Sequence, residues 1–263
     1  MLFTAGRVAE CKTIRFVLRE RSGVLRTISD WWKQESSSKG KLIALRKLAA
    51  ILWEFTRDST PQRRRSRYGD ADFDWDHRVD TTGATVSARN RLLGLFHSPY
   101  QPTDPALFHE MMSALKIDFA HFTFLDIGSG KGRALLLAAD YPFRRIVGVE
   151  LLPELHRIAQ ENIAKYASDS QKCSQLEIVC ADATEFQFPA DPLLLYLFNP
   201  LPEPALETTL TRLENSWRES HRPIIVLYHN PVLEHVFLQR TAWQKIGGTP
   251  QYAIFGLLGH SDG

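Results

Sequence analysis

The sequence has few cysteines and no long apolar run. Its three cysteines, Cys11, Cys173 and Cys180, are too few and too widely spaced for a disulfide framework or a zinc site. We therefore expect no metal and a reducing compartment, which favours the cytoplasm. No apolar run approaches the roughly 20 residues that cross a bilayer, so we expect no integral membrane association.

The chain also lacks a Walker loop and a dinucleotide fingerprint, although it has a glycine-rich turn. This turn, DIGSGKG over residues 126–132, follows an apolar segment that favours a buried strand. A Walker loop needs Ser or Thr where Gly132 stands, so we expect no nucleoside triphosphate site. Dinucleotide sites prefer G-x-G-x-x-G, whereas this turn is G-x-G-x-G with Asp126 before its first glycine. The spacing argues against NAD.

The three glycines, Gly128, Gly130 and Gly132, let a ligand approach the backbone N–H groups of the turn closely. An apolar helical segment over residues 134–139 follows at once, and the partial positive charge at its start favours an anion. A second apolar strand ends at Glu150, whose carboxylate can accept two hydrogen bonds and so suits a vicinal diol. The pattern predicts a nucleoside-cofactor site at the edge of a parallel sheet.

Together, this turn and Glu150 resemble the cofactor site of class I S-adenosylmethionine (SAM) dependent methyltransferases. The resemblance implies that SAM is the cofactor, that Asp126 serves its methionine end and that Glu150 holds both ribose hydroxyls. It also implies that Asp182, after a third strand, accepts a hydrogen bond from the adenine amino group. The predicted cofactor-binding residues are Asp126, Gly128, Ser129, Gly130, Gly132, Glu150, Leu151, Asp182, Ala183 and Asn199.

The downstream sequence alternates between helical and strand patterns. We expect helices near 153–166 and 204–219, and strands near 175–180, 193–198 and 223–228. The succession predicts a doubly wound, mainly parallel seven-stranded α/β sheet with helices on both faces. The segment 243–255 predicts a C-terminal antiparallel hairpin that closes the sheet.

Charge is distributed unevenly along the chain. Residues 1–70 carry 16 Lys+Arg against 7 Asp+Glu, a balance of +9, while the remainder carries 16 against 23, a balance of −7. Residues 42–53 predict an amphipathic helix, and the arginines within 63–67 could bind nucleic acid, an acidic protein or an anionic membrane surface, or could simply be solvated. The predicted parts are a basic, largely helical N-terminal extension over 1–67, a lid or linker over 68–103 and a methyltransferase domain over 104–263.

The strand near 193–198 ends in an Asn-Pro-Leu-Pro turn that begins at Asn199. This turn resembles the Asn/Asp-Pro-Pro-aromatic motif of amide and exocyclic-amine methyltransferases, but Leu201 replaces the second proline and Pro202 the aromatic ring. The lost aromatic ring weakens the case for a nucleobase acceptor. Asn199 could accept a hydrogen bond from an amine while Pro200 shapes the turn; the alternative is that the turn only ends the strand.

Two further segments contribute candidate residues on the acceptor side. Tyr228 and His229 end the next strand, and His229 could take a proton near neutral pH or could simply satisfy backbone groups. The Tyr-x-Pro-Thr stretch from Tyr100 to Thr103 resembles one in protein-lysine methyltransferases; the alternative is helix capping and packing. The predicted catalytic residues are Asn199, Tyr228 and His229, and the predicted substrate contacts are Tyr100, Thr103 and Pro200.

The sequence thus predicts a SAM-dependent methyltransferase acting on a nucleophilic acceptor, with nitrogen favoured. A protein lysine is the first choice, a nucleic acid the second and a small molecule the third; the alternative to an enzyme is a non-catalytic SAM-binding module. Alignment of the reactants can supply about 7 to 11 kcal/mol, so the lack of a strong base does not exclude catalysis. Because SAM has no phosphate, Lys131 and Arg133 are expected to face solvent.

Overall fold

The structure is a computed structural model, and it divides the chain into two compact units. One unit comprises residues 1–60 and 87–99, the other residues 61–86 and 100–263. The residues it describes are 28–29, 31–33, 35–37, 40–58, 71–82 and 101–257. In the first unit, α3 spans Lys41–Asp58 and includes the helix predicted over 42–53.

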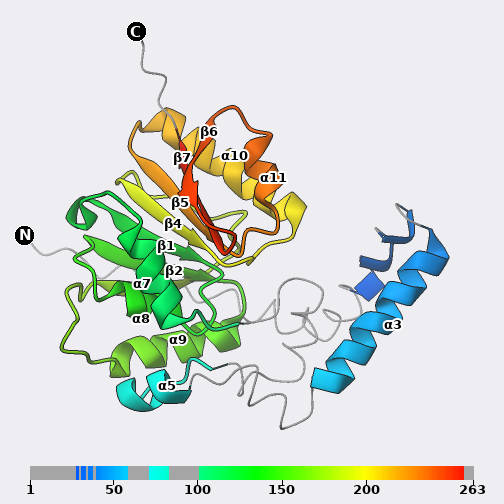
Figure 1. The fold of residues 1–263 in the computed structure, drawn as a ribbon, viewed down its shortest axis with the longest axis horizontal. Coiled ribbons are helices and arrows are strands. Elements are labelled where there is room, and N and C mark those ends of the chain that lie inside the picture. Colours follow the sequence, from blue (N-terminus) through cyan, green and yellow to red (C-terminus); the bar gives the residue numbers. More distant parts are fainter. Residues whose placement is uncertain are drawn as a thin grey trace, which may run out of the picture. The chain divides into compact units, whose positions relative to one another are not determined.

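A seven-stranded sheet forms the second unit, with the strand order β3-β2-β1-β4-β5-β7-β6 (Figure 1). The strands are β1 (Thr123–Ile127), β2 (Arg145–Glu150), β3 (Leu176–Cys180), β4 (Leu193–Leu197), β5 (Ile224–His229), β6 (Trp243–Gly248) and β7 (Tyr252–Leu257). The first five are parallel, and β7 is antiparallel to both β5 and β6. The predicted mainly parallel α/β sheet with a C-terminal hairpin is confirmed.

Helices alternate with the parallel strands as predicted, except that β4 follows β3 without a helix between them. The helices are α5 (Ala71–His77), α7 (Pro105–Ser113), the 3-10 helix η2 (Phe119–His121), α8 (Arg133–Ala138), α9 (Pro153–Lys165), α10 (Glu203–Glu219) and α11 (Glu234–Leu238). Asp104 caps α7 by accepting a hydrogen bond from the Leu107 N–H at 2.8 Å, and Pro105 occupies its first turn. The sequence did not predict α5 and α11, because seven and five residues are too few to display a helical repeat.

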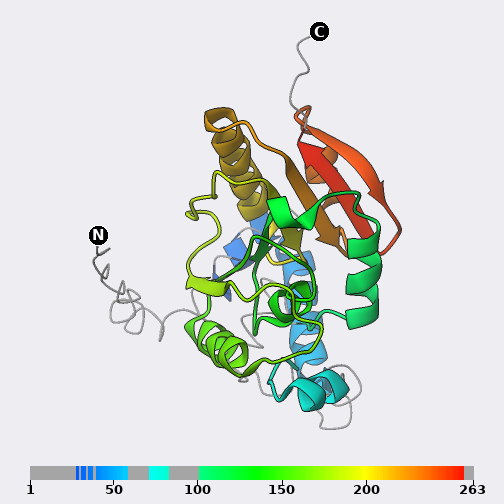
Figure 2. The same cartoon turned by 90° about the vertical axis from the view of Figure 1, so that its left-hand side faces the viewer.

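Apolar side chains cover both faces of the sheet. Along β1, Phe124 packs with α7 and α8, whereas Leu125 and Ile127 pack with α10 and α11 on the other face. This is the two-residue alternation of a strand. Figure 2 shows α7 and α10 on opposite sides of the sheet. All residues of β1 and β4 are buried, as expected for central parallel strands covered on both faces.

The strand order reverses between β1 and β4, and both strands end at the same edge of the sheet. Ligands of such sheets bind outside the carboxyl ends of the strands at this reversal. The glycine turn follows β1 here, and the Asn199 turn follows β4. The β6–β7 turn reaches the same edge, because Tyr252 pairs with His229 at the end of β5.

Several expectations fall partly outside the described residues. The segment predicted as a lid, 68–103, is described only at 71–82 and 101–103, and Tyr100 is not described. The boundaries proposed after residues 67 and 103 therefore stay predictions. Of the helices within the described ranges, none is both long enough and apolar enough to cross a membrane.

Candidate active site

The glycine turn has a backbone shape that requires glycine. The φ angles of Gly128, Gly130 and Gly132 are 74°, 55° and 86°, in the left-handed region that side chains disfavour. The N–H groups of Gly128 and Ser129 donate to the Val149 carbonyl at 2.8 and 3.1 Å. The turn is thereby fastened to the end of β2.

The missing side chain of Gly128 also lets the turn after β4 come close. A Cβ atom on Gly128 would lie 2.3 Å from the Cβ of Pro200, far inside the contact distance of two carbons. The cofactor turn and the turn that carries Asn199 are therefore in direct contact. Any side chain at Gly128 would force them apart.

Glu150 is buried at the end of β2, and the backbone of the glycine turn donates a hydrogen bond to its carboxylate. Its Oε2 accepts a hydrogen bond from the Gly130 N–H at 2.8 Å, and its Oε1 accepts one from the Leu152 N–H at 2.7 Å. Burial raises the pKa of Glu150, and these amide hydrogen bonds oppose the rise. A carboxylate offers about four acceptor positions, so Glu150 can also accept a hydrogen bond from a ligand hydroxyl.

Asp126 lies between Gly148 of β2 and Tyr196 of β4 and is only 3% exposed. Burial raises its pKa well above the ordinary value, and the charge of Glu150 raises it further. Two acidic groups that repel one another in a buried place bind a cation favourably. The site thus favours a positively charged ligand group beside Asp126.

Ser129 adds a polar group without a partner to the same place. Its Oγ is buried and makes no hydrogen bond with any described residue. A Cβ on Gly148 would lie 2.8 Å from this Oγ and 2.7 Å from Leu135 Cδ1, so only glycine fits there. A buried hydroxyl without a partner costs free energy, which a ligand would recover by hydrogen bonding to it.

Three further predicted cofactor residues lie just after the ends of β2 and β3. Asp182 is exposed, and its Oδ1 accepts hydrogen bonds from the N–H and Oγ1 of Thr184 at 2.8 and 2.7 Å. Leu151 is 47% exposed, whereas Ala183 is buried in the core. The predicted adenine contact of Asp182 and the predicted cofactor contacts of Leu151 and Ala183 stay predictions.

On the acceptor side, Asn199 and Tyr228 form one hydrogen-bonded pair. The Tyr228 hydroxyl donates to Asn199 Oδ1 at 2.9 Å, and Asn199 Nδ2 donates to the Asn230 carbonyl at 2.7 Å. Burial raises the pKa of Tyr228 to about 12, so the phenol remains a donor at neutral pH. Asn199 and Asn230 have φ angles of 48° and 49°, and each precedes a proline, where helical backbone is disfavoured.

His229 belongs to a second polar cluster, with Tyr196 and Thr103, and Phe198 packs against it. Its Nδ1 lies 2.8 Å from the Tyr196 hydroxyl, which in turn lies 3.0 Å from Thr103 Oγ1. The imidazole stacks on the Phe198 ring with centroids 3.8 Å apart. Burial lowers the pKa of His229 to about 4, against the opposing charge of Asp104, so the ring is neutral at pH 7.

The three predicted catalytic residues are thus divided between two clusters. Tyr228 and His229 are successive residues of β5, so their side chains point to opposite faces of the sheet. Tyr228 packs near Phe237 of α11, whereas His229 lies beside Tyr196. Sequence reasoning missed Tyr196. The signal was available, because a tyrosine within an otherwise apolar buried strand needs a hydrogen-bond partner.

The expectation that Lys131 and Arg133 face solvent is wrong. Their exposed fractions are 0% and 2%. Lys131 Nζ lies 2.8 Å from Asp80 Oδ1, and Arg133 Nη2 lies 3.2 Å from Asp74 Oδ1. The expectation failed because it considered only the cofactor as a partner for these cations. Asp80 and Asp74, far upstream in the chain, are their acceptors instead.

Comparison with known proteins agrees with this geometry. Residues 124–219 match the family model of a methyltransferase domain. The chain contains a class I SAM-dependent methyltransferase domain. No curated protein matches the chain significantly.

Several solved structures are similar to part of this chain. They include the 23S rRNA methyltransferase ErmE, 14% identical with a TM-score of 0.42, covering 61% of this chain and 70% of that one. A ribosomal protein L11 methylase from Lactobacillus delbrueckii subsp. bulgaricus is 12% identical with a TM-score of 0.39, covering 58% and 74%. A dimethyladenosine transferase from Plasmodium falciparum is 13% identical with a TM-score of 0.43, covering 60% and 62%.

The residues of the methyltransferase domain fit SAM chemically. SAM has a sulfonium and an ammonium that suit the acidic pair, a ribose diol that suits the Glu150 carboxylate, and hydrogen-bonding groups for the Ser129 hydroxyl. SAM is the methyl donor of this domain. Within the described residues, no group of three or more His, Cys, Asp or Glu is arranged to hold a metal ion.

Proposed function

We propose that this methyltransferase domain methylates a nitrogen atom, and that the acceptor is a lysine side chain of a protein. One observation carries the proposal. The contact of Pro200 with Gly128 places Asn199 directly beside the cofactor turn. A polar side chain fixed at that place is suited to orient an amine toward the methyl group.

Residue roles on the cofactor side follow from burial and charge. We assign the positively charged methionine end to Asp126 and the ribose hydroxyls to Glu150. The glycine turn supplies backbone N–H groups and the Ser129 hydroxyl. The adenine ring is assigned to Leu151, Asp182 and Ala183, at the ends of β2 and β3.

Asn199 would guide the acceptor nitrogen. Bound SAM supplies a methyl group on a positively charged sulfur, where a nitrogen lone pair can displace it. Asn199 Oδ1 accepts one hydrogen bond from Tyr228, and its second lone pair can accept an N–H from the amine. Tyr228 and the Asn230 carbonyl hold the amide in place, so the lone pair has a fixed direction.

The protonation states favour an amine over a hydroxyl or carbon acceptor. Tyr228, with a pKa of about 12, remains protonated, and His229, with a pKa of about 4, is too weak a base to ionise an alcohol. An amine needs no strong base, because partial burial favours its neutral form and lowers its pKa. Its released proton can pass to water.

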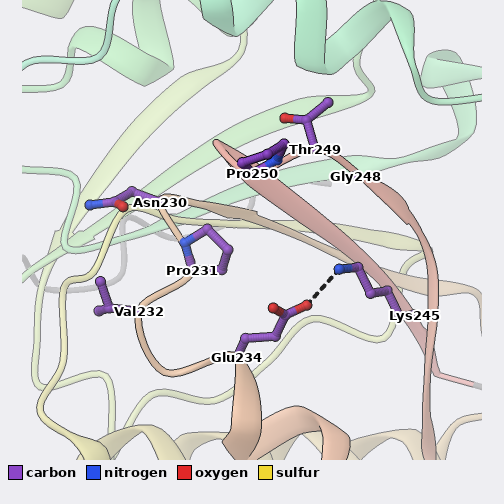
Figure 3. A pocket seen from close by; sticks show the side chains of 8 residues that line it. All are labelled: Asn230, Pro231, Val232, Glu234, Lys245, Gly248, Thr249 and Pro250. Atoms are coloured by element: carbon purple, nitrogen blue, oxygen red, sulfur yellow. Dashed lines mark ion pairs between the residues drawn. The ribbon is translucent and has the colours of Figure 1, made fainter.

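A depression beside Asn230 supports a polymeric acceptor. It has a volume of about 500 Å³ and is lined by Asn230, Pro231, Val232, Glu234, Lys245, Gly248, Thr249 and Pro250 (Figure 3). Lys245 Nζ and Glu234 Oε1 form an ion pair across it at 2.7 Å, without hydrogen-bond alignment. Small-molecule sites enclose most of the ligand surface, whereas most residues around this depression are exposed. A peptide segment that flanks the acceptor lysine would fit it.

A nucleic acid is the second candidate, because residues 1–70 carry a balance of +9. The remainder of the chain carries a balance of −7, which disfavours contact with phosphates by the methyltransferase domain itself. We therefore rank a protein first. Nucleic acid binding would weaken steeply with salt concentration, which distinguishes the two candidates.

The test is incubation of the full chain with tritiated SAM and fractionated lysate. We expect label in material that protease releases and nuclease does not. Asn199→Ala should lower kcat about 10- to 100-fold, as expected for a lost orienting contact, while the Kd of SAM stays within about two-fold. The matched control is Asn215→Ala, an exposed asparagine on α10. Label released by nuclease would refute the protein acceptor, and a fully active Asn199→Ala variant would refute the role of Asn199.

A further inference from the structure

Residues 71–82, here named the strap, pack against the outside of the glycine turn. The ammonium of Lys131, in the middle of the turn, donates to Asp80 Oδ1 at 2.8 Å and to the Thr82 carbonyl at 2.7 Å. The Lys131 side chain is fully buried, whereas 43% of the Asp80 side chain is exposed. A buried ammonium without such partners would be strongly destabilising, so this pair fixes the strap to the turn.

Asn162 of α9 joins the same two segments through its side-chain amide. Its Oδ1 accepts from the Asp80 N–H at 2.8 Å, and its Nδ2 donates to the Asp80 carbonyl at 2.7 Å. The second Nδ2 hydrogen goes to the Lys131 carbonyl at 2.9 Å. The amide thereby holds the backbone of the turn and the backbone of the strap at a fixed separation, and it is 2% exposed.

Arg133 makes a second attachment at the start of α8. Its Nε donates to Thr81 Oγ1 at 2.5 Å, and its guanidinium carbon lies 4.4 Å from the centroid of the Phe73 ring. Asp74, which pairs with Arg133, also accepts from the Thr81 and Thr82 N–H groups at 2.8 and 2.9 Å. The strap is therefore ordered by its own hydrogen bonds as well as by the domain.

These contacts surround a turn that would otherwise be free to change shape. Its three glycines lose more conformational freedom on ordering than any other residues would. On the inner side, Glu150 and the Val149 carbonyl hold the turn, and on the outer side the strap holds it. A site held in its binding shape before the ligand arrives binds more tightly, because the ligand need not order it.

We propose that Lys131, Asp80 and Asn162 are positioning residues, through which the strap keeps the glycine turn in its cofactor-binding shape. Cofactor affinity then depends on a segment about 50 residues upstream of the turn. By reciprocity, cofactor binding must stabilise the strap on the turn. The inference concerns cofactor binding only, so the identity of the methyl acceptor does not affect its test.

The test compares Lys131→Met with the wild-type chain. Methionine fills a similar apolar volume, and the exposed part of Asp80 keeps that carboxylate solvated, so the fold should persist. Calorimetry should show a Kd for S-adenosylhomocysteine raised about ten-fold, equivalent to about 1.4 kcal/mol. In hydrogen exchange, the ligand should slow exchange at residues 71–82 in the wild-type chain and not in the variant.

Asp80→Asn and a control variant complete the test. Asp80→Asn should also raise the Kd, and the double variant should be no worse than Lys131→Met alone, because loss of the Lys131 ammonium already removes its pair with Asp80. Arg157→Gln, which breaks an exposed ion pair with Glu161 on α9, is the matched control and should change nothing. A Kd within two-fold of wild type in Lys131→Met and Asp80→Asn would overturn the proposal, even if their melting temperatures fell. So would slowed exchange of the strap in Lys131→Met on ligand binding.

Discussion

The contact between Gly128 and Pro200 can be tested by adding one methyl group. In Gly128→Ala, the φ angle of 74° would cost the new side chain about 1 to 2 kcal/mol. The new Cβ would also lie 2.3 Å from Pro200 Cβ, and neither atom can rotate away. Overpacking of this kind costs about 1 to 3 kcal/mol. We expect a loss of about 2 to 5 kcal/mol in the free energy of unfolding.

Gly132→Ala is the matched control, because Gly132 lies in the same turn with a φ angle of 86°. Its added Cβ would lie 3.4 Å from Ala159 Cβ, much farther than the 2.3 Å at Gly128. The conformational cost is the same, about 1 to 2 kcal/mol, and the effect of alanine on the unfolded chain cancels between the two variants. The difference in free energy of unfolding between the two variants therefore measures the cost of forcing the cofactor turn and the Asn199 turn apart.

Urea unfolding followed by circular dichroism measures both losses, and calorimetry measures S-adenosylhomocysteine binding. Gly128→Ala should be less stable than Gly132→Ala by about 1 to 3 kcal/mol. It should also bind the ligand more weakly, because Pro200 and the turn must separate. Equal losses of stability in the two variants would refute the claim that the cofactor turn and the Asn199 turn are in contact.

Two predictions concern protonation. Asp126→Asn should abolish SAM binding yet stabilise the unliganded protein at pH 7, because folding raises the pKa of Asp126 and its ionised form therefore opposes folding. The lower stability of the wild type should be full above that raised pKa, shrink as pH falls through it, and vanish near the ordinary pKa of an aspartate. Urea titrations from pH 4 to 8 test this, and a less stable variant at pH 7 contradicts it. His229 has a pKa lowered from 6.5 to about 4, so the wild-type chain should lose about 3 kcal/mol relative to His229→Gln as pH falls across that window. If the stabilities of these two proteins changed in parallel with pH, folding would not lower the pKa of His229.

The sheet and the cofactor turn could be predicted because their signals are local. Apolar runs such as residues 193–197 specify buried parallel strands without reference to the rest of the chain. The glycine spacing over 128–132 specifies a turn whose backbone conformation few other residues can adopt. Glu150 follows from its place at the end of the second strand. These features can therefore be predicted from short segments of the sequence alone.

The strap could not be predicted in this way. Lys131 pairs with a carboxylate 51 residues away, and Arg133 with one 59 residues away, across a segment without clear periodicity. A charged residue in a sequence indicates neither whether it is buried nor which partner it has. The hydrogen bonds of Asn162 likewise become evident only once α9 is packed beside the turn.

The acceptor side is an intermediate case. The polar residues at the ends of β4 and β5 were identified, but Tyr228 and His229 were treated as one cluster. Strand alternation alone puts these neighbours on opposite faces. The pairing of His229 with Tyr196, by contrast, depends on the register between β4 and β5, which the sequence does not specify.

The central claim is that the crevice at the ends of β1, β2 and β4 binds the nucleoside cofactor. The most direct measurement is a crystal structure of the full chain with S-adenosylhomocysteine. The account predicts ligand density over the glycine turn, with the ribose hydroxyls on the Glu150 carboxylate and the amino-acid end beside Asp126. Ligand density at another place, or a crevice filled by side chains of the protein at saturating ligand, would contradict it.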